Sequence, residues 1–210
     1  MTENQLREDI ATLGRSMYER GLTHGSTGNI SARCADGWLL TPTGASLGRL
    51  DPARIAKLDW SGRLISGDPP SKENFLHLAM YEERPQDSAV IHLHATHSVA
   101  VSVLADTNPQ DALPALTAYY VMRIGTLPMA PYYAPGDMAL AGAVRKLATR
   151  HHAMLLANHG PVVSGSSLAA AADAIEELEA TARLYLLLRG EKTRLLEVAQ
   201  VAELKQRYPM

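Results

Sequence analysis

The chain has 210 residues, of which 46% are hydrophobic and 20% charged, and its formal net charge is −2. A chain of this size buries a core of its own, so it needs neither disulfides nor a structural metal to fold. Its charge provides no overall basic field, which excludes general binding to nucleic acid or to an anionic membrane.

The single cysteine, Cys34, rules out an intrachain disulfide and fits a reducing compartment. The first residues are polar, unlike a signal peptide, and no apolar stretch approaches the roughly 18–20 residues of a membrane span. We therefore expect a cytoplasmic protein with one domain over 1–210. Its core should cover about 5–190, and 191–210 should form a C-terminal helical tail.

Near the N-terminus, apolar residues recur at helical spacing: Leu6, Ile10, Leu13 and Met17. This pattern predicts a helix to about residue 20, which Gly21 should end. A glycine-rich turn is expected over 23–31, followed by two short strands in ISARC and GWLLTPTG. Residues 55–65 are typical of two strands around a turn.

The middle of the chain begins with a loop and a short helix over 67–85, for which Ser71 is a reasonable N-cap. The segment SAVIHLH (88–94) alternates with the period of a strand. Residues 95–105 then have helical character. On the predicted strand, each face receives three residues: Ala89, Ile91 and Leu93 on one, and Val90, His92 and His94 on the other.

Towards the C-terminus, 114–132 is typical of two strands with turns, and Asp137 should cap the helix that follows. Residues 153–165 predict a buried strand, a tight turn and a second strand, and 166–190 predict a long helix that ends at a glycine. The chain has neither a regular βαβ rhythm nor a GxGxxG turn, which argues against a Rossmann domain. A mixed, largely antiparallel sheet flanked by helices fits better.

Histidines suggest a metal site. The HLH motif places His92 and His94 on one strand face with Cα atoms roughly 7 Å apart, or leaves them as polar residues on a solvated face. His159, in the ANHG turn, is a third ligand or an ordinary turn histidine. Glu73 is a fourth ligand or simply an acid at a helix start. Together they suit Zn²⁺, with Mn²⁺ or Co²⁺ as alternatives, whereas His97 should support the structure instead.

Two loops suggest an anion site, because the Gly/Ser/Thr-rich segments 25–31 and 41–44 can offer backbone N–H groups and hydroxyls to a phosphate. Each is otherwise an ordinary turn. Lys72 could add a positive charge or stay solvated. Tyr119 and Tyr120 are candidate proton donors or strand-packing residues, and the nearby Arg123 is an anion contact or a salt-bridge partner.

The ordered motifs GSTGNIS, TPTG, PSKE, HLH and ANHG resemble those of the class II aldolase/adducin family over roughly residues 5–190. The resemblance implies an α/β fold, a three-layer α/β/α sandwich around a mainly antiparallel sheet. It also implies a homotetramer with active sites at subunit interfaces.

The resemblance assigns roles to individual residues. The metal ligands would be His92, His94 and His159, with Glu73 as the acid/base carboxylate beside the metal. A catalytic tyrosine from the neighbouring subunit would be Tyr119, with Tyr120 as the alternative. The phosphate would be bound by the two loops and the segment before Glu73: Ser26, Asn29, Thr43, Gly44 and Ser71.

The stretches PPSKE, YYVMR, APYYAPGD and ANHGPVV resemble a decarboxylase branch of this family. That branch implies metal-dependent conversion of 3-oxo-tetronate 4-phosphate to dihydroxyacetone phosphate and CO₂ in acid-sugar catabolism. Lys72 stands where the aldolases tend to carry serine, and it would bind the phosphate or the C1 carboxylate. The alternatives are a zinc-dependent fuculose or ribulose phosphate aldolase and a non-catalytic, adducin-like interaction module.

Overall fold

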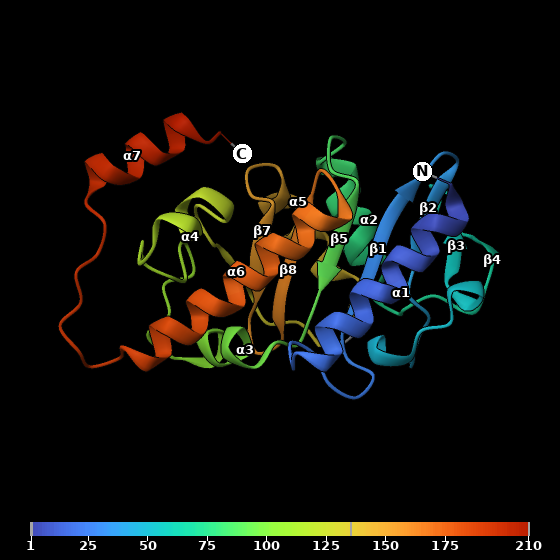
Figure 1. The fold of residues 1–210 in the computed structure, drawn as a ribbon, viewed down its shortest axis with the longest axis horizontal. Helices are drawn as coiled ribbons and strands as arrows, with labels where there is room; N and C mark the ends of the chain where they lie inside the picture. Colours follow the sequence, from blue (N-terminus) through green and yellow to red (C-terminus); the bar gives the residue numbers. More distant parts are fainter. Residues whose placement is uncertain (1, 135, 210) are drawn as a thin grey trace.

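The computed structural model describes residues 2–134 and 136–209, and in this part the chain builds one eight-stranded sheet with helices on both faces (Figure 1). The strands are β1 (Asn29–Cys34), β2 (Gly37–Leu40), β3 (Ala56–Leu58), β4 (Leu64–Ser66), β5 (Ala89–His92), β6 (Met129–Ala130), β7 (Ala153–Leu156) and β8 (Gly160–Gly165). The helices are α1 (Glu3–Glu19), α2 (Asn74–Glu83), α3 (Thr96–Val103), α4 (Ala118–Arg123), α5 (Ala139–Ala148), α6 (Leu168–Leu187) and α7 (Val198–Arg207). Two 3₁₀ turns, Leu47–Arg49 and Pro52–Arg54, lie between β2 and β3.

The strand order across the sheet is β4-β3-β2-β1-β5-β8-β7-β6. Every neighbouring pair is antiparallel except β6 and β7, which run parallel. The expected mixed, mainly antiparallel sheet is therefore confirmed. Its centre is formed by β1, β5 and β8, so segments far apart in the sequence meet there.

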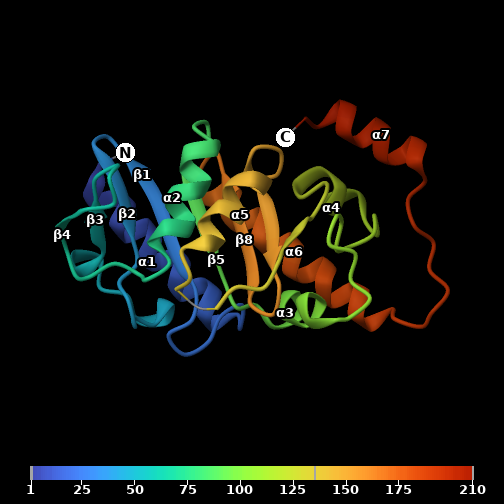
Figure 2. The ribbon, with the colours of Figure 1, turned by 180° about the vertical axis from the view of Figure 1, so that it is seen from behind.

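Helices cover both faces of the sheet. The long helices α1 and α6 lie across one face in Figure 1, and the view from behind in Figure 2 shows α2 and α5 on the other. Alternate residues of β5 enter opposite hydrophobic clusters, because successive side chains of a strand point to opposite faces. Ile91 packs in the cluster with Ile175 of α6, and Val90 packs in the cluster with Met80 of α2. The three-layer sandwich is thus confirmed.

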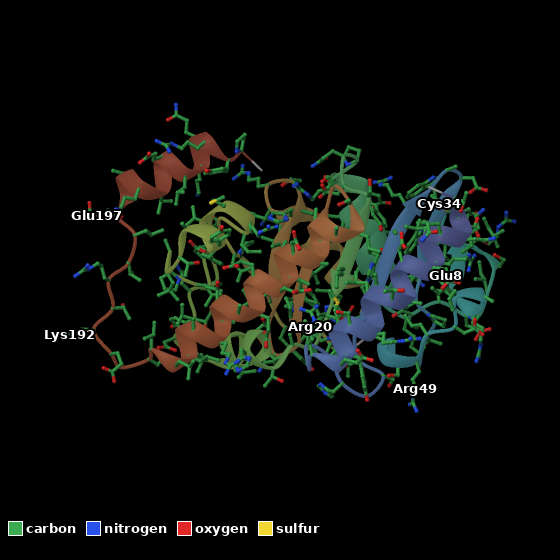
Figure 3. The ribbon with its side chains drawn as sticks, viewed as in Figure 1. Glu8, Arg20, Cys34, Arg49, Lys192 and Glu197 are labelled. Carbon is green, nitrogen blue, oxygen red and sulfur yellow. The ribbon has the colours of Figure 1, made fainter. Side chains whose placement is uncertain are left out.

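The two helices on the first face are also joined by an ion pair. Arg20, labelled in Figure 3, donates to both carboxylate oxygens of Glu176 at 2.6 and 2.5 Å. Arg20 comes just after α1, and Gly21 follows with a φ of 74°, so the expected helix stop is confirmed. The pair is partly exposed, and such pairs contribute little to stability.

The predicted strands over 114–132 are wrong for most of that segment. Within it the chain forms helix α4, and only Met129–Ala130 is a strand. The hydroxyl of Thr117 accepts a hydrogen bond from the N–H of Tyr120 at 3.1 Å and so caps the helix. Aromatic and β-branched residues favour a strand on composition, but this local cap and packing against α6 and α7 decide for a helix.

Three predicted boundaries also need correction. Helix α2 begins at Asn74, so Ser71 is not its N-cap, although the Ser71 hydroxyl accepts from the N–H of Glu73 at 3.3 Å. Helix α5 begins at Ala139 with Met138 in the cap position, and the Asp137 carboxylate accepts from the N–H of Ala139 at 2.9 Å. Strand β5 ends at His92, so His94 lies beyond it.

The C-terminal segment after α6 is irregular as far as α7, so helix covers only Val198–Arg207 of the described part of the tail predicted over 191–210. Glu197 and Gln200 form a reciprocal capping box at the start of α7. In both ribbon views α7 lies beside α4, away from the centre of the sheet (Figures 1 and 2). Among the helices described, none combines the length and apolar character needed to cross a membrane.

Candidate metal centre

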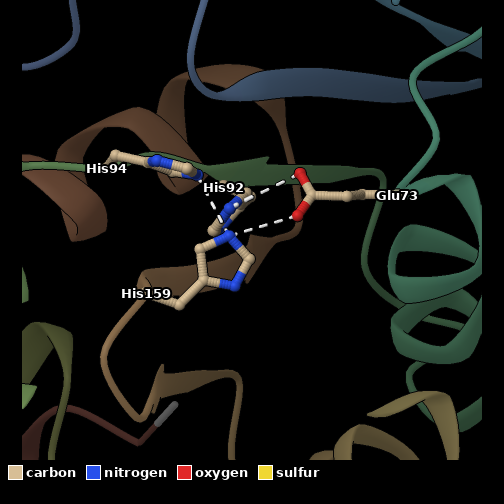
Figure 4. Close-up of side chains that lie close together, drawn as sticks. All are labelled: Glu73, His92, His94 and His159. Carbon is tan, nitrogen blue, oxygen red and sulfur yellow. Dashed lines mark hydrogen bonds and ion pairs between the residues drawn. The ribbon is translucent and has the colours of Figure 1, made fainter. Parts of the chain in front are cut away.

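Four potential metal ligands converge from three separate segments. His92 ends β5, His94 follows two residues later, His159 lies in the turn between β7 and β8, and Glu73 immediately precedes α2. Because β5 pairs with β8 in the sheet, the end of one strand lies beside the start of the other. Figure 4 shows the three imidazoles and the carboxylate of Glu73 pointing toward one another.

The spacing of these ligands fits a single ion. One ligand atom from each residue lies within 4.8 Å of all the others. The Nε2 atoms of His94 and His159 are 3.0 Å apart, and Glu73 lies 3.2 Å from His159 Nε2 and 3.6 Å from His92 Nε2. Ligands at about 2.0–2.1 Å around a tetrahedral zinc would lie roughly 3.3 Å from one another. The four side chains therefore converge closely enough to bind one ion.

The hydrogen bond of His92 sets which nitrogen faces this centre. His92 is fully buried, and its Nδ1–H donates to the carbonyl oxygen of Pro161 at 2.9 Å. The lone pair is therefore on Nε2, which is buried and has no hydrogen-bond partner among the described residues. A buried polar atom without a partner is costly, and a metal ion would satisfy it. This is the clearest sign in the structure that the cluster fits a cation.

Electrostatics give these groups the protonation states that a metal requires. Burial lowers the pKa of His92, and burial together with the neighbouring His92 and His159 lowers the pKa of His94 to about 4. Burial alone would raise the pKa of Glu73, but His92 and hydrogen bonds from His159 and Asn29 hold it well below the usual range. At neutral pH the site thus offers the neutral imidazoles of His92 and His94 and the ionised carboxylate of Glu73.

The turn that carries His159 has the backbone expected of the ANHG motif. Asn158 has a positive φ of 57°, a conformation that asparagine tolerates better than most residues. A Cβ on Gly160 would lie 2.2 Å from the carbonyl oxygen of Leu93. Only glycine therefore allows this turn to approach the backbone between His92 and His94, which brings His159 to the other two histidines.

A cavity of about 840 Å³ opens beside the centre. Its lining contains every residue predicted to bind the phosphate, together with the predicted acid/base carboxylate: Ser26, Asn29, Thr43, Gly44, Ser71, Lys72 and Glu73. His94 and His159 line it as well. The two Gly/Ser/Thr-rich loops, Glu73, His94 and His159 therefore share one open space, large enough for a small phosphorylated molecule.

Tyr119 and Tyr120 are not among the described residues around this cavity. Tyr120 is buried, its hydroxyl donates to the carbonyl of Leu113 at 3.4 Å, and burial raises its pKa. Tyr119 is 62% exposed on α4. Arg123 pairs with Asp173 at 2.8 Å, which agrees with its interpretation as a salt-bridge residue.

Two tyrosines that were not predicted as site residues, Tyr132 and Tyr133, line the cavity together with His24. These residues belong to the segments APYYAPGD and THGSTG, but no local sequence pattern shows that the two segments fold back over the metal ligands.

His97 has the supporting role expected of it. Its backbone N–H and its Nδ1 contact Glu179 Oε1 at 2.9 and 2.7 Å, and it is not one of the four clustered ligands.

Comparison with known proteins agrees with the fold. The family model for the Class II Aldolase and Adducin N-terminal domain matches residues 8–186. A curated relative from Cupriavidus necator, 3-oxo-tetronate 4-phosphate decarboxylase, is 50% identical over 188 residues, which cover 90% of this chain and 87% of the relative. The match therefore extends over almost the whole of both proteins.

A more distant curated relative, L-fuculose phosphate aldolase from Escherichia coli, is 35% identical over 188 residues, covering 89% of this chain and 85% of the relative. Among solved structures, YgbL from Escherichia coli superposes with a TM-score of 0.95 at 44% identity, over 97% of this chain and 99% of that one.

Proposed function

The chain belongs to the class II aldolase and adducin family, and from this premise we propose that it is a carboxy-lyase. Its substrate would be 3-oxo-tetronate 4-phosphate and its products dihydroxyacetone phosphate and CO₂. The observation that carries the proposal is the intact cluster of Glu73, His92, His94 and His159 in a chain 50% identical to a decarboxylase of that name.

We propose Zn²⁺ as the metal, held by His92, His94 and His159 with Glu73 beside it. Three neutral imidazoles and a carboxylate suit Zn²⁺, although Mn²⁺ and Co²⁺ accept the same donors. A bound divalent ion would supply Lewis-acid stabilisation for negative charge that develops on substrate oxygens. The donation from His92 to Pro161 supports this assignment, because it leaves Nε2 free to bind.

The substrate phosphate would lie between the two loops of the cavity. Backbone N–H groups and hydroxyls of 25–31 and 41–44 suit a phosphate dianion, and Ser71 is positioned beside them by its contact with Asn29. Lys72 is exposed at the same cavity and would add a positive charge. We assign it to the phosphate, because tight pairing with the departing carboxylate would stabilise the ground state and oppose loss of CO₂.

The bond that breaks is C1–C2, and its electron pair remains on C2 as CO₂ leaves. What this chain must then supply is a proton at C2. Glu73 is held ionised by its hydrogen bonds, which makes it a poor donor before it has taken up a proton. Tyr119, exposed on α4, is therefore our candidate donor, and it would act in the site of a neighbouring subunit. The buried Tyr120 is a poor alternative.

This role for Tyr119 requires an oligomer, and we propose a homotetramer with its active sites at the subunit interfaces. Acid-sugar catabolism would place the enzyme in the cytoplasm. We propose no nucleic-acid or membrane partner, which is consistent with the net charge of −2.

The second candidate function is a sugar-phosphate aldolase, which the 35% identity to L-fuculose phosphate aldolase supports. Both reactions break a C–C bond beside a carbonyl, so the same metal centre serves either. A non-catalytic interaction module is disfavoured, because such a protein has no need of four converging metal ligands.

The deciding experiment supplies the purified, metal-loaded protein with 3-oxo-tetronate 4-phosphate and, separately, with fuculose 1-phosphate and ribulose phosphate. We expect CO₂ and dihydroxyacetone phosphate from the first and no aldehyde from the others. A His159→Ala variant is the control, and it should be inactive with all three. Aldehyde release without CO₂ would replace the decarboxylase proposal with the aldolase.

A further inference from the structure

A line of hydrogen-bonded side chains leads from the metal centre into the protein interior. It consists of Glu73, Asn29, His77, Ser31 and Tyr81. The last four are buried, with at most 3% of each exposed, and only Glu73 and Asn29 reach the cavity. The three interior residues therefore cannot touch a substrate held in that cavity, and their polar groups need another explanation.

The contacts along this line are short and continuous. The amide nitrogen of Asn29 lies 2.7 Å from Glu73 Oε2 and 3.2 Å from Ser71 Oγ. The amide oxygen of Asn29 contacts His77 Nε2. On the other side of the ring, His77 Nδ1 lies 2.7 Å from Ser31 Oγ, which lies 2.8 Å from the Tyr81 hydroxyl.

Only one direction of donation satisfies every contact. An ionised carboxylate only accepts, so Asn29 must turn its NH₂ to Glu73 and its oxygen to His77. His77 therefore donates from Nε2. Burial lowers the pKa of His77 to about 3, so the ring carries one proton, and its Nδ1 must accept from the Ser31 hydroxyl. Ser31 in turn accepts from Tyr81.

This direction has a consequence for the metal centre. If His77 carried its proton on Nδ1, two lone pairs would face each other between the ring and Asn29, and both buried groups would lose their partners. Asn29 could then turn its amide over, which would point its oxygen at the carboxylate of Glu73. The proton on His77 Nε2 thus fixes Asn29, and Asn29 fixes the oxygen of Glu73 that faces His92.

We propose that His77 is a positioning residue of the metal centre: through Asn29 it fixes the orientation of the Glu73 carboxylate, and Ser31 and Tyr81 hold its tautomer. The inference rests on the metal centre of the proposed function. Partners behind a metal ligand typically change metal affinity by about 10–100-fold when they are removed.

The test compares two substitutions in the full-length protein by Zn²⁺ affinity, measured in competition with a chelator. His77→Phe keeps a ring beside Trp38, which stacks on His77 with an interplanar angle of 16°, but it cannot donate. His77→Gln can still extend an amide N–H toward Asn29. We expect about 10–100-fold weaker Zn²⁺ binding for Phe, and binding near wild type for Gln.

The matched control is His152→Phe, because His152 is another partly buried histidine, and its Nδ1 contacts the carbonyl of Ser164 at 3.0 Å, outside the line. It should leave Zn²⁺ affinity unchanged. If His77→Phe does not fold, Ser31→Ala removes the donor to His77 Nδ1 with a smaller change in volume. That variant should also weaken Zn²⁺ binding.

A second readout needs no metal. The ¹⁵N chemical shifts of His77 in the metal-free protein should show a protonated Nε2 and an unprotonated Nδ1. A proton on Nδ1 would overturn the proposal, as would equal affinity losses for His77→Phe and His77→Gln. If the wild type binds no Zn²⁺, the metal centre itself is wrong. If the wild type binds Zn²⁺ and the variants bind it equally well, only the role of His77 is wrong.

Discussion

Glu179 and Ser98 are joined by two hydrogen bonds to one oxygen: the backbone N–H and the hydroxyl of Ser98 both donate to Glu179 Oε2, at 2.9 and 2.7 Å. The other oxygen accepts from the N–H of His97. The carboxylate therefore caps the N-terminus of α3 from α6, although α6 is far away in the sequence. Because α3 begins two residues after His94, this contact also anchors the segment that carries a proposed metal ligand.

Glu179→Gln should lower the free energy of unfolding by about 2–3 kcal/mol, because it replaces a buried carboxylate acceptor with an amide that can accept through only one atom. Urea unfolding of the metal-free protein measures this. The control is Glu176→Gln on the same helix, which breaks the partly exposed pair with Arg20 and should cost less than about 1 kcal/mol. If both variants lose the same unfolding free energy, Glu179 contributes no more to stability than a surface charge does.

Removal of the metal should lower both activity and stability. A ligand that binds only the folded state stabilises it by about 2.7 kcal/mol at a concentration 100 times its dissociation constant. Chelation should therefore abolish CO₂ release and decrease Tm, and added Zn²⁺ should restore both. His159→Ala should lose the Tm response to Zn²⁺, whereas His151→Ala, outside the cluster, should keep it. If the Tm of the wild type changes with neither chelator nor added Zn²⁺, the proposed metal centre is contradicted.

Lys72→Ser should raise the KM for the phosphorylated substrate by about tenfold with a smaller change in kcat, because one charged contact to a phosphate is lost. Lys146→Ser, on the exposed surface of α5, is the matched control and should change neither constant. Steady-state kinetics of CO₂ release make the comparison. Unchanged kinetics in Lys72→Ser would remove this residue from the substrate site.

Tyr119→Phe should lower kcat with little change in KM, because the hydroxyl is proposed to deliver a proton after the substrate has bound. Mixing this variant with His159→Ala tests whether the donor comes from a neighbouring subunit. Each variant is defective alone, but mixed oligomers would contain sites that join an intact metal centre to an intact Tyr119. Recovery of activity after subunit exchange is the expected result, and its absence would show that Tyr119 acts in the site of its own subunit. An unchanged kcat in Tyr119→Phe would point instead to Tyr132 or Tyr133, which line the cavity.

Stability should fall on acidification because of His77. Its pKa is about 3 in the folded protein and 6.5 in the unfolded chain, so the unfolded state takes up the proton first as the pH falls. The stability that the neutral His77 ring provides is fully present above pH 6.5 and is lost progressively down to about pH 3. Between pH 7 and pH 5 the protein should lose about 2 kcal/mol of its unfolding free energy in this way. The unfolding free energy of metal-free His77→Gln should therefore depend less on pH than that of the wild type. Equal slopes of unfolding free energy against pH in the two proteins would contradict this prediction.

Much of the fold could be predicted from local patterns. The helical spacing before Gly21, the alternation in β5 and the strand–turn–strand of β7 and β8 all appear as expected, because each rests on periodicity and turn chemistry within a few residues. The strand prediction for the segment around Tyr119 was wrong for the opposite reason. Its composition suits a strand, and it becomes a helix through a cap from Thr117 and contacts with elements distant in the sequence.

For the site, the sequence by itself identified candidate metal ligands: His92 and His94 in the HLH motif, and His159 in the ANHG turn, where Asn158 has a positive φ and Gly160 leaves no room for a Cβ. Only the tertiary structure decided how they work. It leaves Nε2 of His92 free through Pro161, and it joins Glu73 to His77 through Asn29. These contacts cross from one element to another, and the direction of each hydrogen bond depends on every partner in the line, which no local pattern encodes.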